Sequence, residues 1–405
     1  MKSLPAATYR WIIVLAGMLG LMGALGLGRF SLGMMLPSMG EGLGLTYGQM
    51  GIISTANFCG YLIAVIGCGS LNSRLGPRLL IFFGLSMIGG SMILIGMMDS
   101  FLPILVLYSL TGVGSALANI PIMSLMAIWF EPEIRGRAAG LCVAGNGLGI
   151  LASGRLVPVM NMSERGWQAS WLVLGGVVAM IGCICFVLIR NRPVDGGSWG
   201  TKGGGPAAPK DRKPAPKSMI YLTAMIYFLF GFTYVIYITF FVTSLVQERG
   251  FTEQAAGILW AWGGLLSIIS GPLFGYFSDK VGRKQALMVV FSIQALAYLS
   301  AALTGYSSSV YFSVFFFSLV AFSVPTIVAA LVGDLAGPQK TASVFGFVTF
   351  VFGLGQIAGP AVAGTIAQYS SGFGPAFILA SILTVVGVIL SGCLKNSVNV
   401  VRKSG

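Results

Sequence analysis

Long apolar segments and short polar segments alternate along almost the entire chain. Each apolar segment has about 20 residues or more, the length that a helix needs to cross a lipid bilayer. Helices are expected because a segment inside lipid must satisfy its own backbone hydrogen bonds. The pattern predicts twelve membrane-spanning helices, over residues 10–37, 47–70, 79–98, 102–129, 137–160, 168–190, 218–246, 253–277, 285–304, 309–333, 342–368 and 374–394.

The composition agrees with this pattern. Of the 405 residues, 56% are hydrophobic and 9% are charged, whereas soluble proteins carry about 25% charged residues. The sequence therefore predicts an all-α polytopic membrane protein. We expect the first span to be a retained helix rather than a signal peptide, because it lacks a clean cleavage site of small residues and leads straight into further spans.

Residues 191–217 form the one long hydrophilic stretch, which is rich in Gly, Pro and Lys. This composition is typical of a flexible linker. The linker divides the chain into an N-terminal six-helix half, residues 1–190, and a C-terminal six-helix half, residues 218–405.

Lysine and arginine side chains are distributed unevenly between the two sides of the predicted membrane. If the amino terminus is cytoplasmic, 20 of the 24 fall in cytoplasmic segments and two, Arg165 and Arg249, fall in outer loops. Cytoplasmic loops of membrane proteins carry an excess of these residues. We therefore expect a multi-pass protein of the bacterial inner membrane with both termini in the cytoplasm. The net charge of +13 then reflects topology, and we expect no nucleic-acid partner.

The two halves align without a gap at a fixed offset of 206 residues. Because each half has an even number of spans, the two copies share one topology. This predicts a pseudo-two-fold axis along the membrane normal, with a cavity between the halves. The aligned segments are residues 45–51 with 251–257, residues 69–78 with 275–284, Gly140 with Gly346, and residues 147–154 with 353–360.

Two loop segments carry a resemblance to a known family. "GYFSDKVGRK" (275–284) resembles the loop signature of the major facilitator superfamily, and its first copy, "GSLNSRLGPR" (69–78), has Ser73 where that signature has Asp. "EPEIRGRAAG" (131–140) resembles the family's loop between the fourth and fifth helices. The resemblance covers the whole twelve-span layout. It implies a secondary carrier, not an enzyme, that works by alternating access as its halves rock.

The first span resembles one branch of this superfamily. Its Gly-x-Gly-Arg-Phe stretch (26–30) and following Leu-Pro resemble a bacterial branch near the organic-anion and monocarboxylate carriers. Two features of true monocarboxylate porters are absent here: the aromatic, Gly-rich signature of the first helix and an arginine in the eighth. Residues 257–277 contain no charge, so the resemblance leaves the substrate open.

Two arginines lie inside predicted spans, although every one of the eleven acidic residues falls in a loop or within about a turn of a helix end. The sequence also contains no histidine. A cation at mid-membrane costs at least about 2.5 to 3.5 kcal/mol and normally has a partner. We therefore expect Arg29 to pair with an anionic substrate, the alternative being a structural arginine that binds helix carbonyls. Arg155 is a possible second site, or it extends to the outer interface.

Uncharged polar residues inside the spans complete the candidate site. The resemblance implies that helices 1, 4, 7 and 10 line the cavity, with helices 2, 5, 8 and 11 beside them. Each such residue has an alternative role in helix packing. The candidates are Asn119, Asn146, Tyr234, Tyr237 and Gln356 as substrate-binding residues with Arg29, and Asn57 and Trp260 as possible further contacts.

The loop signature suggests a gate. Asp279 is expected near the positive end of the fifth helix, where a carboxylate is favourable, and Arg135 or Arg137 would pair with it. This contact would hold the cytoplasmic side closed in the outward-facing state, whereas the alternative is a topological anchor without a gating role. Arg283, Arg74 and Arg78 complete the candidate gating set.

These features together predict a carrier, expected to be monomeric in the lipid bilayer, for a small organic anion such as a mono- or dicarboxylate. One alternative is proton-coupled efflux of drugs or cations, since "GQIAGPAVAG" (355–364) resembles an antiporter motif. That chemistry normally uses a membrane carboxylate. Another alternative is a non-transporting membrane sensor. The six cysteines form no metal pattern, and we expect no metal or cofactor.

Overall fold

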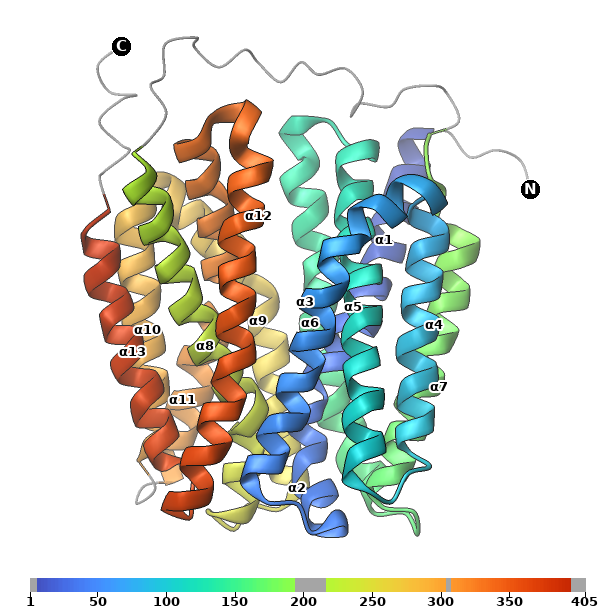
Figure 1. Ribbon diagram of the computed structural model, residues 1–405, viewed down its shortest axis with the longest axis vertical. Coiled ribbons are helices and arrows are strands. Elements are labelled where there is room, and N and C mark those ends of the chain that lie inside the picture. Colours follow the sequence, from blue (N-terminus) through green and yellow to red (C-terminus); the bar gives the residue numbers. More distant parts are fainter. Residues whose placement is uncertain (1–5, 194–215, 304–306, 395–405) are drawn as a thin grey trace.

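The computed structural model describes residues 6–193, 216–303 and 307–394, and most of the predicted linker, residues 194–215, lies outside the described residues (Figure 1). Within these ranges every regular element is a helix. The elements are α1 (Ala6–Leu21), η1 (Met22–Phe30), α2 (Leu32–Leu43), α3 (Tyr47–Leu75), α4 (Pro77–Ile95), α5 (Phe101–Trp129), α6 (Pro132–Asn161), α7 (Trp167–Leu188), α8 (Lys217–Gln247), α9 (Glu253–Val281), α10 (Arg283–Ala302), α11 (Ser307–Val320), α12 (Ser323–Ser370) and α13 (Gly374–Gly392).

Twelve helical segments in the described chain are long and apolar enough to cross a membrane, which confirms the predicted fold class. Most predicted span boundaries are correct to within a few residues. The first span differs, because its helix continues past Pro37 to Leu43 and contains a nine-residue π-helix, η1. Neighbouring helices allow a proline inside a membrane helix by satisfying the backbone group that it frees.

Helix ends repeat between the two halves. Thr46 caps α3 and Thr252 caps α9, each accepting a hydrogen bond from the backbone N–H three residues later. Gly76 and Gly282 end the same two helices with φ values of 79° and 96°. Left-handed backbone of this kind favours glycine. Both pairs lie 206 residues apart, the offset at which the sequence repeats.

The helices run side by side, with α1–α7 on one side of the bundle and α8–α13 on the other (Figure 1). Across the seam between these groups, α3 packs against α12 and α6 packs against α9. We call the end where α1 begins and α13 ends the terminal end. The opposite end, where α2 ends and α9 begins, is the distal end.

The two sides meet closely at the distal end and separate toward the terminal end. At Gly51 on α3, an added Cβ would overlap the Pro360 carbonyl on α12. At Gly353, an added Cβ would lie 2.8 Å from Leu62. Two turns further toward the terminal end on the same helix faces, a Cβ added at Gly69 or Gly346 would meet no atom within 4 Å. The conformation is therefore closed at the distal end and open at the terminal end.

A polar cluster links the two sides at the distal end. The Glu253 carboxylate of α9 accepts hydrogen bonds from Ser38 Oγ (2.5 Å) and Asn161 Nδ2 (2.8 Å), and Asn161 Oδ1 accepts one from Ser170 Oγ (2.7 Å). These four residues, the distal cluster, join α2, α6 and α7 to α9. No feature of the sequence pattern predicted this cluster.

Candidate functional site

Arg29 is buried near the middle of the bundle, and only 7% of its surface is exposed. Its Nε donates a hydrogen bond to Asn57 Oδ1 at 3.0 Å. Its guanidinium carbon lies 4.8 Å from the ring centroid of Phe58 and 4.4 Å from that of Tyr61. Aromatic faces attract cations. The described residues therefore surround this charge with an amide oxygen and two rings, and its buried Nη2 has no partner among them.

The local backbone positions Arg29 through an unusual helix. Residues 22–30 form π-helical turns. Such turns are rare in proteins, and those that occur are often found at functional sites. Two α5 hydroxyls donate to carbonyls of this segment: Tyr108 to Arg29 O (3.0 Å) and Ser115 to Ala24 O (2.9 Å). The hydroxyls of α5 thus hold the η1 backbone on either side of Gly26 and Gly28.

Asn57 orients the arginine. It is fully buried, and its Nδ2 donates to the Tyr108 carbonyl (3.1 Å) and to Thr111 Oγ1 (2.7 Å). These two bonds direct Oδ1 toward Arg29. The sequence suggested Asn57 as a further substrate contact, but its amide is occupied by protein partners in this conformation.

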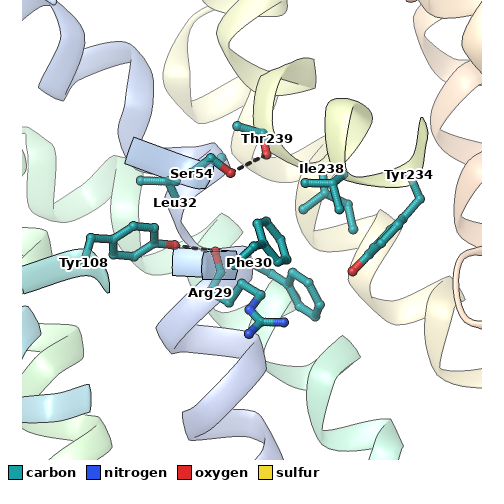
Figure 2. Close-up of a pocket in the computed structure, with 11 residues that line it drawn as sticks. Arg29, Phe30, Leu32, Ser54, Tyr108, Tyr234, Ile238 and Thr239 are labelled. Atoms are coloured by element: carbon teal, nitrogen blue, oxygen red, sulfur yellow. Dashed lines mark hydrogen bonds between the residues drawn. The ribbon is translucent and has the colours of Figure 1, made fainter. Parts of the chain in front are cut away.

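A narrow cavity lies beside Arg29, and it has room for about one water molecule. Figure 2 shows Arg29, Phe30 and Tyr108 on one side, and Tyr234 and Ile238 of α8 on the other. Both halves of the chain therefore contribute to this cavity. A hydrogen bond between Ser54 Oγ and Thr239 Oγ1 (3.0 Å) joins the halves at its edge.

Tyr234 lies on the wall opposite Arg29, and Gln356 holds its hydroxyl from behind. Gln356 Nε2 donates to the Tyr234 hydroxyl at 2.7 Å, and the Tyr234 ring stacks on Phe230 with centroids 4.8 Å apart. The hydroxyl oxygen points toward the side of the cavity where Arg29 lies (Figure 2). Because it accepts from Gln356, this hydroxyl keeps its own hydrogen for donation to a ligand.

Asn119 reaches the site through another residue. Its Nδ2 donates to the Tyr61 hydroxyl at 3.0 Å, and the Tyr61 ring lies on the Arg29 guanidinium. Sequence reasoning missed Tyr61, Phe58 and Tyr108. The position of Phe58 and Tyr61 beside Asn57 on α3 was the available signal, because rings on one helix face suit a buried cation.

The remaining predicted binding residues lie elsewhere. Asn146 of α6 is buried, and its Oδ1 has no partner among the described residues. Tyr237 and Trp260 line a separate cavity, where the Tyr237 hydroxyl pairs with Ser313 Oγ at 2.9 Å. Arg155 is exposed on α6 and does not line the Arg29 cavity.

The candidate gating residues form contacts within each half. Arg283 pairs with Asp279, and its Nε lies 3.1 Å from Asp334 Oδ2, which links α9, α10 and α12. Arg135 Nη2 donates instead to the Ala127 and Phe130 carbonyls, at 3.3 and 3.4 Å. The expected pairing of Asp279 with Arg135 or Arg137 is absent from this conformation, because the helices separate at the terminal end.

The first copy of the loop signature, residues 69–78, makes different contacts from the second copy. Arg78 Nε donates to the Phe186 carbonyl at 2.7 Å, and its guanidinium lies 4.3 Å from the Phe186 ring centroid. This contact ties α4 to α7. Arg74 and Arg137 are exposed.

Comparison with known families decides which transporters this chain is related to. The family model described as "Uncharacterised MFS-type transporter YbfB" matches residues 21–392. The chain belongs to this family of the major facilitator superfamily. The resemblance seen in the loop signature is thereby confirmed, and the chain is a multi-pass membrane transporter rather than an enzyme.

Other members of the superfamily resemble the chain over most of its length. The hexuronate transporter of Bacillus subtilis (strain 168) is 26% identical over 382 residues, which cover 89% of this chain and 88% of that protein. The oxalate:formate antiporter of Oxalobacter formigenes is 25% identical over 344 residues, covering 80% and 77%. A crystal structure of a bacterial homologue of the human lysosomal transporter Spinster has the same fold, with a TM-score of 0.78, 14% identity and 97% of each chain covered.

Proposed function

We propose that this transporter carries a small organic anion, a mono- or dicarboxylate, and that Arg29 pairs with the anion. The observation that supports this most strongly is the buried guanidinium with its neutral neighbours. Burying a charge without an opposite charge is costly. An anion in the adjoining cavity would remove that cost by meeting the unpartnered Nη2.

The opposite wall supports the same proposal. Tyr234 offers a hydroxyl hydrogen across the cavity, and Gln356 orients it. Charged acceptors form stronger hydrogen bonds than neutral ones. The relatives named above transport hexuronate and exchange oxalate for formate, and these substrates are organic anions.

Transport would proceed by alternating access. The excess of Lys and Arg on the terminal side supports a cytoplasmic terminal end, and with that orientation the conformation described here would be inward-facing. Rocking of the halves would open the distal end and close the terminal end. Asp279 would then approach Arg135 or Arg137, with which it forms no ion pair in the present conformation.

A thermal-shift screen on the purified protein tests the charge class and the site together. Sodium salts of carboxylates are compared with organic cations, on the wild type and on Arg29→Gln. A ligand at 100 times its Kd stabilises the folded state by about 2.7 kcal/mol. We expect carboxylates to raise the melting temperature of the wild type and not of Arg29→Gln. Equal stabilisation of both proteins, or stabilisation by cations alone, would contradict the proposal.

A further inference from the structure

Basic and aromatic side chains gather at the terminal end of the N-terminal half, where α1 packs against α5, α6 and α7. The guanidinium carbon of Arg10 lies 5.9 Å from the Phe130 ring centroid, and that of Arg190 lies 4.1 Å from the Tyr9 ring centroid. Arg135 donates to the Phe130 carbonyl at 3.4 Å. We call this group the arginine cluster, and it comprises Tyr9, Arg10, Trp129, Phe130, Arg135 and Arg190.

The rings of the arginine cluster are held in place by backbone carbonyls near the end of α7. Tyr9 Oη donates to the Leu188 carbonyl at 2.9 Å, and Trp129 Nε1 donates to the Arg190 carbonyl at 3.2 Å. The two ring centroids lie 5.7 Å apart. Because the polar atoms of both rings are bonded to backbone, the ring faces remain for the cations, which they attract.

The three arginines have no carboxylate partner among the described residues. Both ion pairs in this part of the chain involve Arg283, and Glu131, which follows Phe130, takes part in neither. The Nε atoms of Arg10 and Arg135 are buried and have no hydrogen-bond acceptor there. An anion beside the cluster would meet donors that are now unused, and charge-assisted hydrogen bonds are the strong ones.

An apolar strip on α1 adjoins the cluster. Trp11 is 44% exposed and Leu15 is 48% exposed, and residues four apart lie on one helix face. The Trp11 ring centroid lies 5.5 Å from that of Phe130 and 6.0 Å from the Arg10 guanidinium carbon. Tryptophan is enriched where a membrane meets water. Charged and apolar surfaces therefore meet here in the order that a phospholipid presents its headgroup and its acyl chains.

Membrane orientation alone does not require this cluster. The C-terminal half crosses the membrane as often as the N-terminal half, and the sequence repeats at an offset of 206 residues. At that offset Trp129 matches Leu335. Arg135 matches Thr341. The second half thus adopts the same topology without these side chains, which leaves the cluster with a role of its own.

We propose that the arginine cluster binds the phosphate headgroup of an anionic phospholipid, whose acyl chains lie along Trp11 and Leu15. This site goes beyond the proposed function and does not depend on it. Guanidinium groups pair with phosphate oxygens through parallel N–H bonds. Basic pockets between membrane helices on the cytoplasmic side bind such headgroups, and the excess of Lys and Arg supports that side for the terminal end.

Native mass spectrometry of the full chain in detergent tests the site. Phosphatidylglycerol is titrated against phosphatidylcholine with the same acyl chains, which contains a phosphate but has no net charge. Attraction to anionic lipid is worth about fivefold in affinity for each basic side chain near the surface. We expect the wild type to prefer phosphatidylglycerol. Arg10→Gln and Arg190→Gln should each weaken its binding about fivefold and leave phosphatidylcholine binding unchanged.

Arg190 is exposed, so Arg190→Gln covers the case in which Arg10→Gln does not fold. The control is the double variant Lys217→Gln and Lys280→Gln, which removes two exposed charges at the same end of the C-terminal half. It should bind phosphatidylglycerol like the wild type. An equal loss in the control and in the cluster variants would mean that only the general surface charge attracts the lipid, and would overturn the inference.

Two soluble competitors separate a lipid site from a phosphate site. Inorganic phosphate and glycerophosphoglycerol carry the charge without acyl chains, and neither should displace phosphatidylglycerol at the lipid's own concentration. Displacement by either would assign the cluster to a free phosphate and contradict the lipid assignment. Wild-type affinity for phosphatidylglycerol in both arginine variants would also contradict it.

Discussion

Arg29 combines a permanent charge with neutral surroundings. Its Nε bonds to the Asn57 amide and its plane lies against Phe58 and Tyr61, while Nη2 remains unpartnered among the described residues. If Arg29 had only a structural role, its nitrogens would be expected to donate hydrogen bonds to helix carbonyls. The observed arrangement favours a ligand instead, because it holds the guanidinium in place without neutralising it.

Placing a fixed carboxylate next to Arg29 should imitate the ligand and exclude it. In Asn57→Asp, the new carboxylate oxygen would occupy the position of Oδ1, 3.0 Å from Arg29 Nε. Close opposite charges in a poorly hydrated site attract strongly. We expect anion binding, measured by titration, to weaken at least tenfold although Arg29 is intact.

Asn72→Asp is the control for this prediction, since it adds the same charge to the same helix, α3, close to its terminal end. It should bind anions like the wild type. If Asn57→Asp also retained wild-type affinity, Arg29 would not be the charge that receives the anion.

At this scale, sequence reasoning identified Arg29, Tyr234 and Gln356. In the structure, Arg29 and Tyr234 lie on opposite walls of one cavity, and Gln356 bonds to the Tyr234 hydroxyl. It grouped Tyr237 with them, but that hydroxyl faces Ser313. The two tyrosines lie three residues apart on α8, only about 60° apart around the helix, and a sequence without neighbouring helices does not show which of the two faces Arg29. The aromatic residues around the guanidinium were missed for the same reason.

At the scale of elements, hydropathy predicted the twelve spans well because the bilayer fixes their length. It did not reveal η1, since a π-helix changes hydrogen bonding within an apolar run and leaves the composition unchanged. It also placed the end of the first helix at Pro37, whereas α2 continues to Leu43. Packing against neighbouring helices, rather than local propensity, decides both features.

Two glycines on one face of α3 should control opposite ends of the transporter. Gly51 and Gly69 are 18 residues apart, which is about five helical turns. The Cβ of a valine at Gly51 would overlap the Pro360 carbonyl in the present conformation, whereas the Cβ of a valine at Gly69 would meet no atom within 4 Å. We expect Gly51→Val to disfavour the distal-closed state and Gly69→Val to disfavour closure of the terminal end.

Spin labels at Ser73 and Lys280, both exposed near the terminal end, provide the measurement. Gly51→Val should add a population with a shorter distance between the labels, and Gly69→Val should remove any such population. Gly176→Val, on the exposed face of α7, should leave the distribution unchanged. Shifts in the same direction for both α3 variants would argue against rocking of the halves.

At the scale of the whole molecule, the sequence repeat predicted two copies of one topology, and the caps at Thr46 and Thr252 and the turns at Gly76 and Gly282 follow the same offset of 206 residues. The sequence did not predict which end of the transporter is open in the structure. Under the proposed mechanism the chain would alternate between two states and carry the contacts of both, so the sequence alone does not show whether Asp279 and Arg135 touch in this one. The hydrogen bonds of the distal cluster around Glu253 join the two sides at the distal end in the present state.

The most direct test of the central claim is solute counterflow in proteoliposomes that contain the full chain. Vesicles preloaded with one unlabelled acid receive the same acid in labelled form, using phenylpyruvate, lactate, oxalate and glucuronate in turn. We predict that at least one acid accumulates with the wild type, that Arg29→Gln lowers its initial rate at least tenfold, and that Arg29→Lys restores part of it. Counterflow in Arg29→Gln at the wild-type rate would contradict the assignment of Arg29 as the charge that binds the transported anion.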